Sequence, residues 1–208
     1  LTELNFAVRI FSLNYDLCLE HHAKERPLEM GFDKTTESWD FRRFEARDEE
    51  APHIYLYKLH GSITWYREKH EGNILKLAAT PQAEPDLIFG TDYKMQYIDP
   101  YLFYAYELRR YSLEAKIILT IGYSFRDDHI NRIITQALQH DQSRVLVAVS
   151  RSATGAIKQL GGSGPQYRAY DQNAAAFLRD ITIAKLENLA GIPHDETPFT
   201  ARPPTATA

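Results

Sequence analysis

Cysteine is nearly absent from this chain of 208 residues, which has only Cys18. A single cysteine cannot form an internal disulfide or a cysteine zinc ribbon, so we expect a fold held by its hydrophobic core and no bound zinc. Long hydrophobic runs are also missing, because no stretch of about 18 apolar residues occurs, and we expect no membrane span. Both absences favour a cytoplasmic protein.

An excess of positive charge is lacking as well. The formal net charge is -4, so we expect no direct binding to nucleic acid. The length suits one α/β domain with a sizeable core. We expect this domain over residues 1–192, followed by a disordered tail at 193–208 that is rich in proline, threonine and alanine.

Short apolar runs alternate with segments of helical periodicity along most of the chain. Strands are expected at residues 6–11, 54–59, 74–77, 87–89, 116–121, 144–149 and 167–169. Helices are expected at residues 17–24, 101–114, 127–140, 153–160 and 173–189. The alternation predicts a Rossmann-like, doubly wound and mostly parallel sheet. Segments 25–52 and 66–100 fit this alternation poorly, and we interpret them as a small inserted module.

Small or polar residues follow four of the expected strands, at the edge where parallel sheets bind ligands. They are Ser12 to Asp16, His60 to Ser62, Gly122 to Ser124, and Ser150. By topology, all four strand ends can share one rim.

Asn14 and Asp16 lie two residues apart after the first of these strands. In an extended chain both side chains point to one face, where an amide and a carboxylate can orient a water or hold a ligand carboxamide. The alternative is that one of them caps the helix expected to begin near Leu17.

His60 is the only one of the eight histidines that ends a strand and precedes a glycine, Gly61. Glycine allows a sharp turn and the close approach of a ligand. A histidine at this place suits proton transfer near neutral pH, although a purely structural histidine is the alternative.

Gly122, Tyr123 and Ser124 have the pattern of a nucleotide-contacting turn between a strand and a helix. The alternative is that Ser124 caps the helix, because Asp127 follows it with the spacing of a capping box. Carboxylates at this helix start oppose a phosphate, so we expect the turn to contact a ribose or a neutral edge.

These motifs, taken in order, resemble the sirtuin-like domains of bacterial antiphage and abortive-infection proteins. The resemblance covers roughly residues 6–181 and rests on three segments, Ser12 to Asp16, Lys58 to Ser62 and Ile121 to Asp128. Such domains consume nicotinamide adenine dinucleotide (NAD), and the resemblance implies a Rossmann-type sheet with a smaller inserted module.

The resemblance also implies individual roles. It places Asn14 beside the nicotinamide ribose and Asp16 near the nicotinamide, and makes His60 the catalytic histidine. The remaining NAD contacts that follow from the motifs are Ser12, Gly61, Gly122, Tyr123 and Ser124, with Ser150 near the adenosine end.

The chain departs from the family pattern in two ways. The first strand and its glycine-rich phosphate loop are expected before Leu1, so we expect activity to depend on that loop. The missing zinc ribbon argues against a third possibility, an NAD-dependent protein deacylase. We therefore expect an NAD hydrolase that is triggered by a sensor domain or partner protein and acts as a homo-oligomer; the alternative is a non-catalytic module that senses NAD or ADP-ribose.

Overall fold

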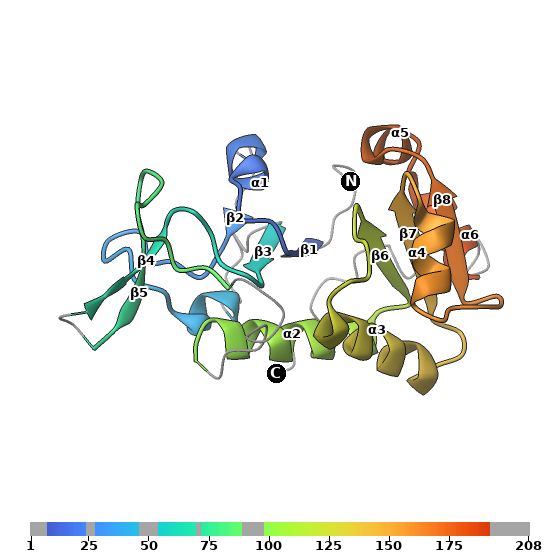
Figure 1. The fold of residues 1–208 in the computed structure, drawn as a ribbon, viewed down its shortest axis with the longest axis horizontal. Helices are drawn as coiled ribbons and strands as arrows, with labels where there is room; N and C mark the ends of the chain where they lie inside the picture. The colour runs from blue at the N-terminus through green and yellow to red at the C-terminus, as the bar shows by residue number, and fades with distance from the viewer. Residues whose placement is uncertain (1–7, 24–27, 46–53, 70–71, 89–97, 192–208) are drawn as a thin grey trace, which may run out of the picture. The chain divides into compact units, whose positions relative to one another are not determined.

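The computed structural model describes residues 8–23, 28–45, 54–69, 72–88 and 98–191 (Figure 1). Contacts divide the chain into two compact units. The N-terminal unit comprises Ala7–Leu108, and the C-terminal unit comprises Arg109–Ala208 together with Leu1–Phe6. The expected tail at 193–208 lies outside the described residues. Within them, no helix is both long and apolar enough to cross a membrane.

The sheet of the N-terminal unit has three parallel strands in the order β1-β3-β2. Its strands are β1 (Val8–Ser12), β2 (Leu28–Glu29) and β3 (Ile54–Lys58), and the short helix α1 (Cys18–His22) follows β1. Strand β2 comes from the segment 25–52 that the sequence analysis assigned to an insertion, and it pairs with β3. At least this part of the segment therefore belongs to the sheet.

Beyond β3 the N-terminal unit contains an antiparallel hairpin, and the sequence analysis recognised only its second strand. The further elements of the unit are the 3-10 helix η1 (Phe41–Phe44), β4 (Trp65–Glu68), β5 (Ile74–Leu77) and helix α2 (Tyr101–Glu114), within which the chain passes to the C-terminal unit. A strand was expected at 87–89. Within it, Leu87 forms only an isolated bridge with Gly61, and Phe89 lies outside the described residues.

The core of the N-terminal unit is largely aromatic. Tyr104 of α2 is fully buried and makes edge contacts with the rings of Phe44 and Tyr57. Its hydroxyl accepts a hydrogen bond from the indole of Trp39 at 3.0 Å and donates one to the carbonyl oxygen of Met30 at 3.1 Å. These bonds satisfy the polar atom that comes with so large an apolar surface.

The C-terminal unit is built on a second parallel sheet, of order β6-β7-β8. Its elements are β6 (Ile117–Ile121), α3 (Asp128–His140), β7 (Val145–Ser150), α4 (Ala153–Gln159), β8 (Tyr167–Asp171), α5 (Ala174–Arg179) and α6 (Ile183–Ala190). The prediction of a single closing helix at 173–189 is wrong, because the chain forms two helices there, α5 and α6. Thr182 separates them, and its hydroxyl oxygen caps the second by accepting from the amide of Lys185 at 3.2 Å.

Helices cover both faces of this sheet, as the alternating side chains of its central strand show. Leu146 and Ala148 pack in a core with residues of α3 and α4. The neighbours Val145, Val147 and Val149 pack on the opposite face in a core with Phe177 of α5. Successive strand residues point to opposite faces, so this apolar strand needs cover on both. The predicted Rossmann-like α/β fold is confirmed.

A buried arginine ties the helix ends of this unit to its sheet. Arg144, directly before β7, is 3 % exposed. Its guanidinium group donates to the carbonyl oxygens of Leu113, Ala115 and Ala137. The first two lie at the end of α2 and before β6, and the third lies in the last turn of α3.

We predict that Arg144→Met destabilises the protein, because it leaves three carbonyl oxygens without their donor. Each buried polar group left unsatisfied costs about 1–3 kcal/mol. Urea unfolding followed by circular dichroism measures the loss. The matched control is Arg151→Met, at an exposed arginine of the same unit, which should change the free energy of unfolding by less than about 0.5 kcal/mol. Equal effects of the two substitutions would contradict this role for Arg144.

Candidate functional site

Parallel pairing of β1 with β3 brings two of the predicted site residues to the same level of the sheet. Ser12 pairs with Lys58, and the amide of Leu59 donates to the carbonyl oxygen of Ser12 at 2.9 Å. Asn14 and His60 each lie two residues beyond that last pair. The register therefore places both residues just beyond the carboxyl ends of neighbouring strands, where parallel sheets bind ligands.

The turn that carries Asn14 is fixed mainly through its backbone. The amide of Asn14 donates to Ser12 Oγ at 3.2 Å, and the carbonyl oxygen of Tyr15 accepts from the amide of Ile63 at 3.1 Å. The side chain of Asn14 is exposed and makes no hydrogen bond with any described residue. The side-chain carboxamide of Asn14 is thus available to a ligand.

Asp16 is not the N-cap residue of α1, which is Leu17, but its carboxylate bonds to the start of that helix. Its Oδ1 accepts from the amide of Cys18, the first residue of α1, at 2.8 Å. The side chain is exposed, so its second oxygen faces solvent. This bond and a ligand contact are compatible, since a carboxylate has two oxygens.

His60 is half-buried beside the aromatic ring of Tyr15, with the two ring centroids 6.4 Å apart. The Tyr15 hydroxyl donates to the carbonyl oxygen of Ile88 at 2.7 Å, and burial raises the pKa of this phenol. The carbonyl oxygen of His60 accepts from the amide of Ile88 at 3.0 Å. The Asn14 turn and the His60 turn are thus both tied to Ile88.

Gly61 follows His60 in a conformation that requires glycine. Its φ is +86°, and a Cβ atom at this position would lie 2.2 Å from the carbonyl oxygen of Asp86 and 2.9 Å from the hydroxyl of Tyr101. The Asp86 carboxylate in turn accepts from the Tyr101 hydroxyl at 2.9 Å and pairs with Arg67 at 3.2 Å. This packing behind Gly61 holds the backbone that carries His60.

The other predicted contacts lie at strand ends of the C-terminal unit. The amide of Gly122 donates to the carbonyl oxygen of Val149 at 2.8 Å, which places Gly122 and Ser150 at the ends of neighbouring strands β6 and β7. Ser150 Oγ accepts from the amide of Ser152 at 3.3 Å. The hydroxyl of Tyr123 bonds to Asp127 and Asn131 within the unit, and burial raises its pKa.

Ser124 does not cap helix α3, contrary to the alternative considered from the sequence. The cap is Asp127, whose Oδ1 accepts from the amides of His129 and Ile130 at 3.1 and 3.4 Å. Ser124 is exposed, and its hydroxyl makes no hydrogen bond with a described residue. The Asp127 carboxylate occupies the start of α3, which supports the expectation that phosphate does not bind there.

The structure thus places the predicted residues in two groups. Ser12, Asn14, Asp16, His60 and Gly61 lie in the N-terminal unit, and Gly122, Tyr123, Ser124 and Ser150 lie in the C-terminal unit. Across the described part of the chain, no group of three or more His, Cys, Asp or Glu side chains could hold a metal ion.

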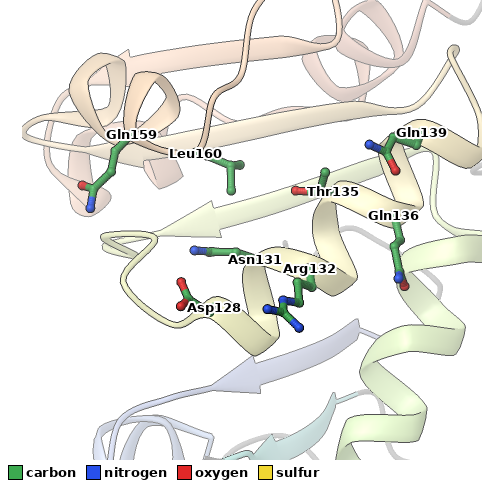
Figure 2. Close-up of a pocket in the computed structure, with 8 residues that line it drawn as sticks. All are labelled: Asp128, Asn131, Arg132, Thr135, Gln136, Gln139, Gln159 and Leu160. Carbon is green, nitrogen blue, oxygen red and sulfur yellow. The ribbon is translucent and has the colours of Figure 1, made fainter. Parts of the chain in front are cut away.

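The C-terminal unit also has a hollow of about 510 Å³ (Figure 2). It lies between one face of α3 and the end of α4, and its lining is mostly polar: Asp128, Asn131, Arg132, Thr135, Gln136, Gln139, Gln159 and Leu160. None of the predicted site residues lines it.

A comparison with protein families gives a match to the SIR2-like domain over residues 8–171, which is most of the chain. The chain belongs to the SIR2-like domain family. The match includes all nine predicted site residues, from Ser12 to Ser150. No curated protein matches the sequence. SIR2-like domains use NAD, so the function of this domain is related to NAD.

One buried residue beside the predicted site residues of the N-terminal unit was given no role from the sequence. Lys58 ends β3, and only 1 % of its surface is exposed. The signal was present, because a lysine at the end of an otherwise apolar strand, IYLYK, must find a partner if the strand is buried.

We predict that Gly61→Ala destabilises the protein far more than Gly72→Ala. Both glycines have positive φ, so both substitutions cost about 1–2 kcal/mol in backbone strain. At Gly61 the added methyl group also overlaps a backbone atom, whereas at Gly72 no atom of the described residues lies within 4 Å of it. Urea unfolding of both variants measures the difference, and equal losses would contradict close packing behind Gly61.

Proposed function

We propose that this SIR2-like domain is an NAD hydrolase that cleaves the bond between nicotinamide and ribose. The observation that carries the proposal is the β1–β3 register, which sets an exposed amide, Asn14, and a half-buried imidazole, His60, at the same step beyond two neighbouring strands. The resemblance to antiphage proteins suggests that this activity depletes NAD during defence. A sensor domain, a partner protein or homo-oligomer formation would trigger it.

The reaction requires positioning more than acid catalysis. The oxygen of a water attacks C1′ of the ribose while the bond from C1′ to the pyridinium nitrogen breaks. The electron pair of that bond stays on the nitrogen, so nicotinamide leaves as a neutral molecule and ADP-ribose remains. The site therefore has to orient the ribose and the water and to stabilise an oxocarbenium-like transition state.

The two residues suit complementary parts of this reaction. The Asn14 side chain can accept from a ribose hydroxyl or from the attacking water and donate to a second oxygen, because an amide does both. The His60 imidazole can take the proton that the water loses, because the unprotonated ring nitrogen of a neutral imidazole is a proton acceptor. NAD contacts by Gly122, Tyr123, Ser124 and Ser150 stay a prediction of the family resemblance.

We predict that Asn14→Ala and His60→Ala each lower the rate of nicotinamide release by about 10²–10⁴-fold, the usual contribution of a preorganised hydrogen-bonding group or of a positioned acid–base group. Both side chains lie at strand ends outside the buried core, so thermal unfolding should be unchanged. Release is measured by chromatography on purified protein supplied with NAD. The matched controls are Asn188→Ala and His140→Ala, exposed residues of the C-terminal unit that should leave the rate unchanged. Unchanged release from Asn14→Ala and His60→Ala would remove both residues from the mechanism.

Titration calorimetry with NAD separates hydrolysis from simple recognition. Binding that is followed by nicotinamide release supports the hydrolase, whereas binding with NAD recovered intact would identify a sensor module instead. Release that requires an acylated peptide would identify a deacylase.

We also predict that removing metal ions does not change the rate. The proposed steps use only an amide, an imidazole and a water, and the single cysteine offers no zinc ribbon. Nicotinamide release after treatment with EDTA should therefore equal that of untreated protein. A loss of activity that added zinc restores would contradict this mechanism.

A further inference from the structure

We infer that Lys58 is a positioning residue, whose buried ammonium group holds the turn that carries Asn14 against the strand that carries His60. This inference deepens the proposed function and rests on it for its catalytic consequence. Its structural part, the restraint of the turn, stands on the contacts of Lys58 alone.

The contacts of Lys58 cross from β3 to the segment after β1. Its Nζ donates to the carbonyl oxygen of Asp16 and pairs with Glu20 Oε1 of α1 at 2.9 Å. The side chain of Lys58 is 2 % exposed and that of Glu20 is 14 % exposed. One cation therefore restrains both the end of the Asn14 turn and the helix that follows it.

The turn is consequently fixed on both sides of Asn14. Before it, the amide of Leu59 holds the carbonyl oxygen of Ser12. After it, Lys58 holds the carbonyl oxygen of Asp16. The Asn14 side chain makes no hydrogen bond with a described residue, so its location depends on the backbone on either side. A shift of about 1 Å in a reacting group can lower a rate by about 10²-fold.

Stability alone does not explain a buried ion pair at this place. Removing two charges from water costs several kcal/mol, and well-packed apolar side chains are often as stabilising as the pair. An apolar side chain cannot, however, donate a hydrogen bond to the Asp16 carbonyl oxygen. The feature that only the lysine supplies is therefore a directional restraint on the turn.

The test compares three variants of the whole chain. Lys58→Met alone would leave Glu20 as an unpaired buried carboxylate, because Oε2 of Glu20 is buried and has no hydrogen-bond partner. The informative variant is therefore Lys58→Met with Glu20→Leu, which removes both charges. Glu20→Gln keeps an acceptor for Lys58 and so keeps the bond to Asp16. Arg43→Met with Glu29→Leu is the matched control, since it removes a second partly buried pair of the N-terminal unit.

The measurements are the melting temperature, kcat and KM for nicotinamide release, and hydrogen exchange of the peptide that spans residues 12–17. We expect the Lys58→Met, Glu20→Leu variant to keep the melting temperature and KM, to lose kcat by about tenfold or more, and to exchange faster in that peptide. Glu20→Gln and the Arg43–Glu29 control should stay close to the wild type in kcat and in exchange.

A Lys58→Met, Glu20→Leu variant with kcat and exchange equal to the wild type would overturn the positioning role. If the wild-type protein releases no nicotinamide, kcat and KM cannot be compared, and hydrogen exchange alone decides the inference. Faster exchange at residues 12–17 in that variant only would then support Lys58 as the restraint of the turn, and unchanged exchange would refute it.

Discussion

Parallel pairing of β1 with β3 is the constraint on which the candidate site depends. The register from Val8 with Ile54 to Ser12 with Lys58 ends both strands at one level, so two turns distant in sequence become neighbours. A slip of one residue would move Asn14 and His60 apart and turn every strand side chain to the opposite face. The buried side chains of β3 resist such a slip, because Leu56 and Tyr57 are almost wholly removed from solvent.

Each unit has a buried cation that donates hydrogen bonds to main-chain carbonyl oxygens. These bonds hold a loop or the end of a helix against a strand. Lys58 bonds to Asp16 beside the candidate site, and Arg144 bonds to carbonyl oxygens before β6 and in α3. Lysine and arginine are seldom buried without a partner, because losing hydration is costly. Arg144 supports the structure of the C-terminal sheet, whereas Lys58 lies beside the candidate site, where the proposed chemistry would be sensitive to a small displacement.

Much of this architecture could be predicted from the sequence, because the signals are local. The continuous apolar run predicted β3, and apolar residues at helical spacing, such as Ile130, Ile134 and Leu138, predicted α3. Pro100 indicated the start of α2, and polar residues after the apolar runs indicated the strand ends. The two residues of β2 have no periodicity and are defined only by pairing with β3. The separation of α5 from α6 at Thr182 and the choice of Asp127 as the cap of α3 were also missed. Each depends on which of several nearby polar side chains bonds to the backbone, and the sequence does not decide this. The partners of Lys58 could not be predicted, since Glu20 lies 38 residues away.

The central claim is that Asn14 and His60 act on one ribose, and a crystal structure of the protein with bound ADP-ribose tests it most directly. The account predicts that the Asn14 amide and the His60 imidazole both lie within hydrogen-bond distance, about 2.6–3.2 Å, of the same ribose or of a water in contact with it. ADP-ribose bound elsewhere, or in contact with only one of the two side chains, would contradict the account.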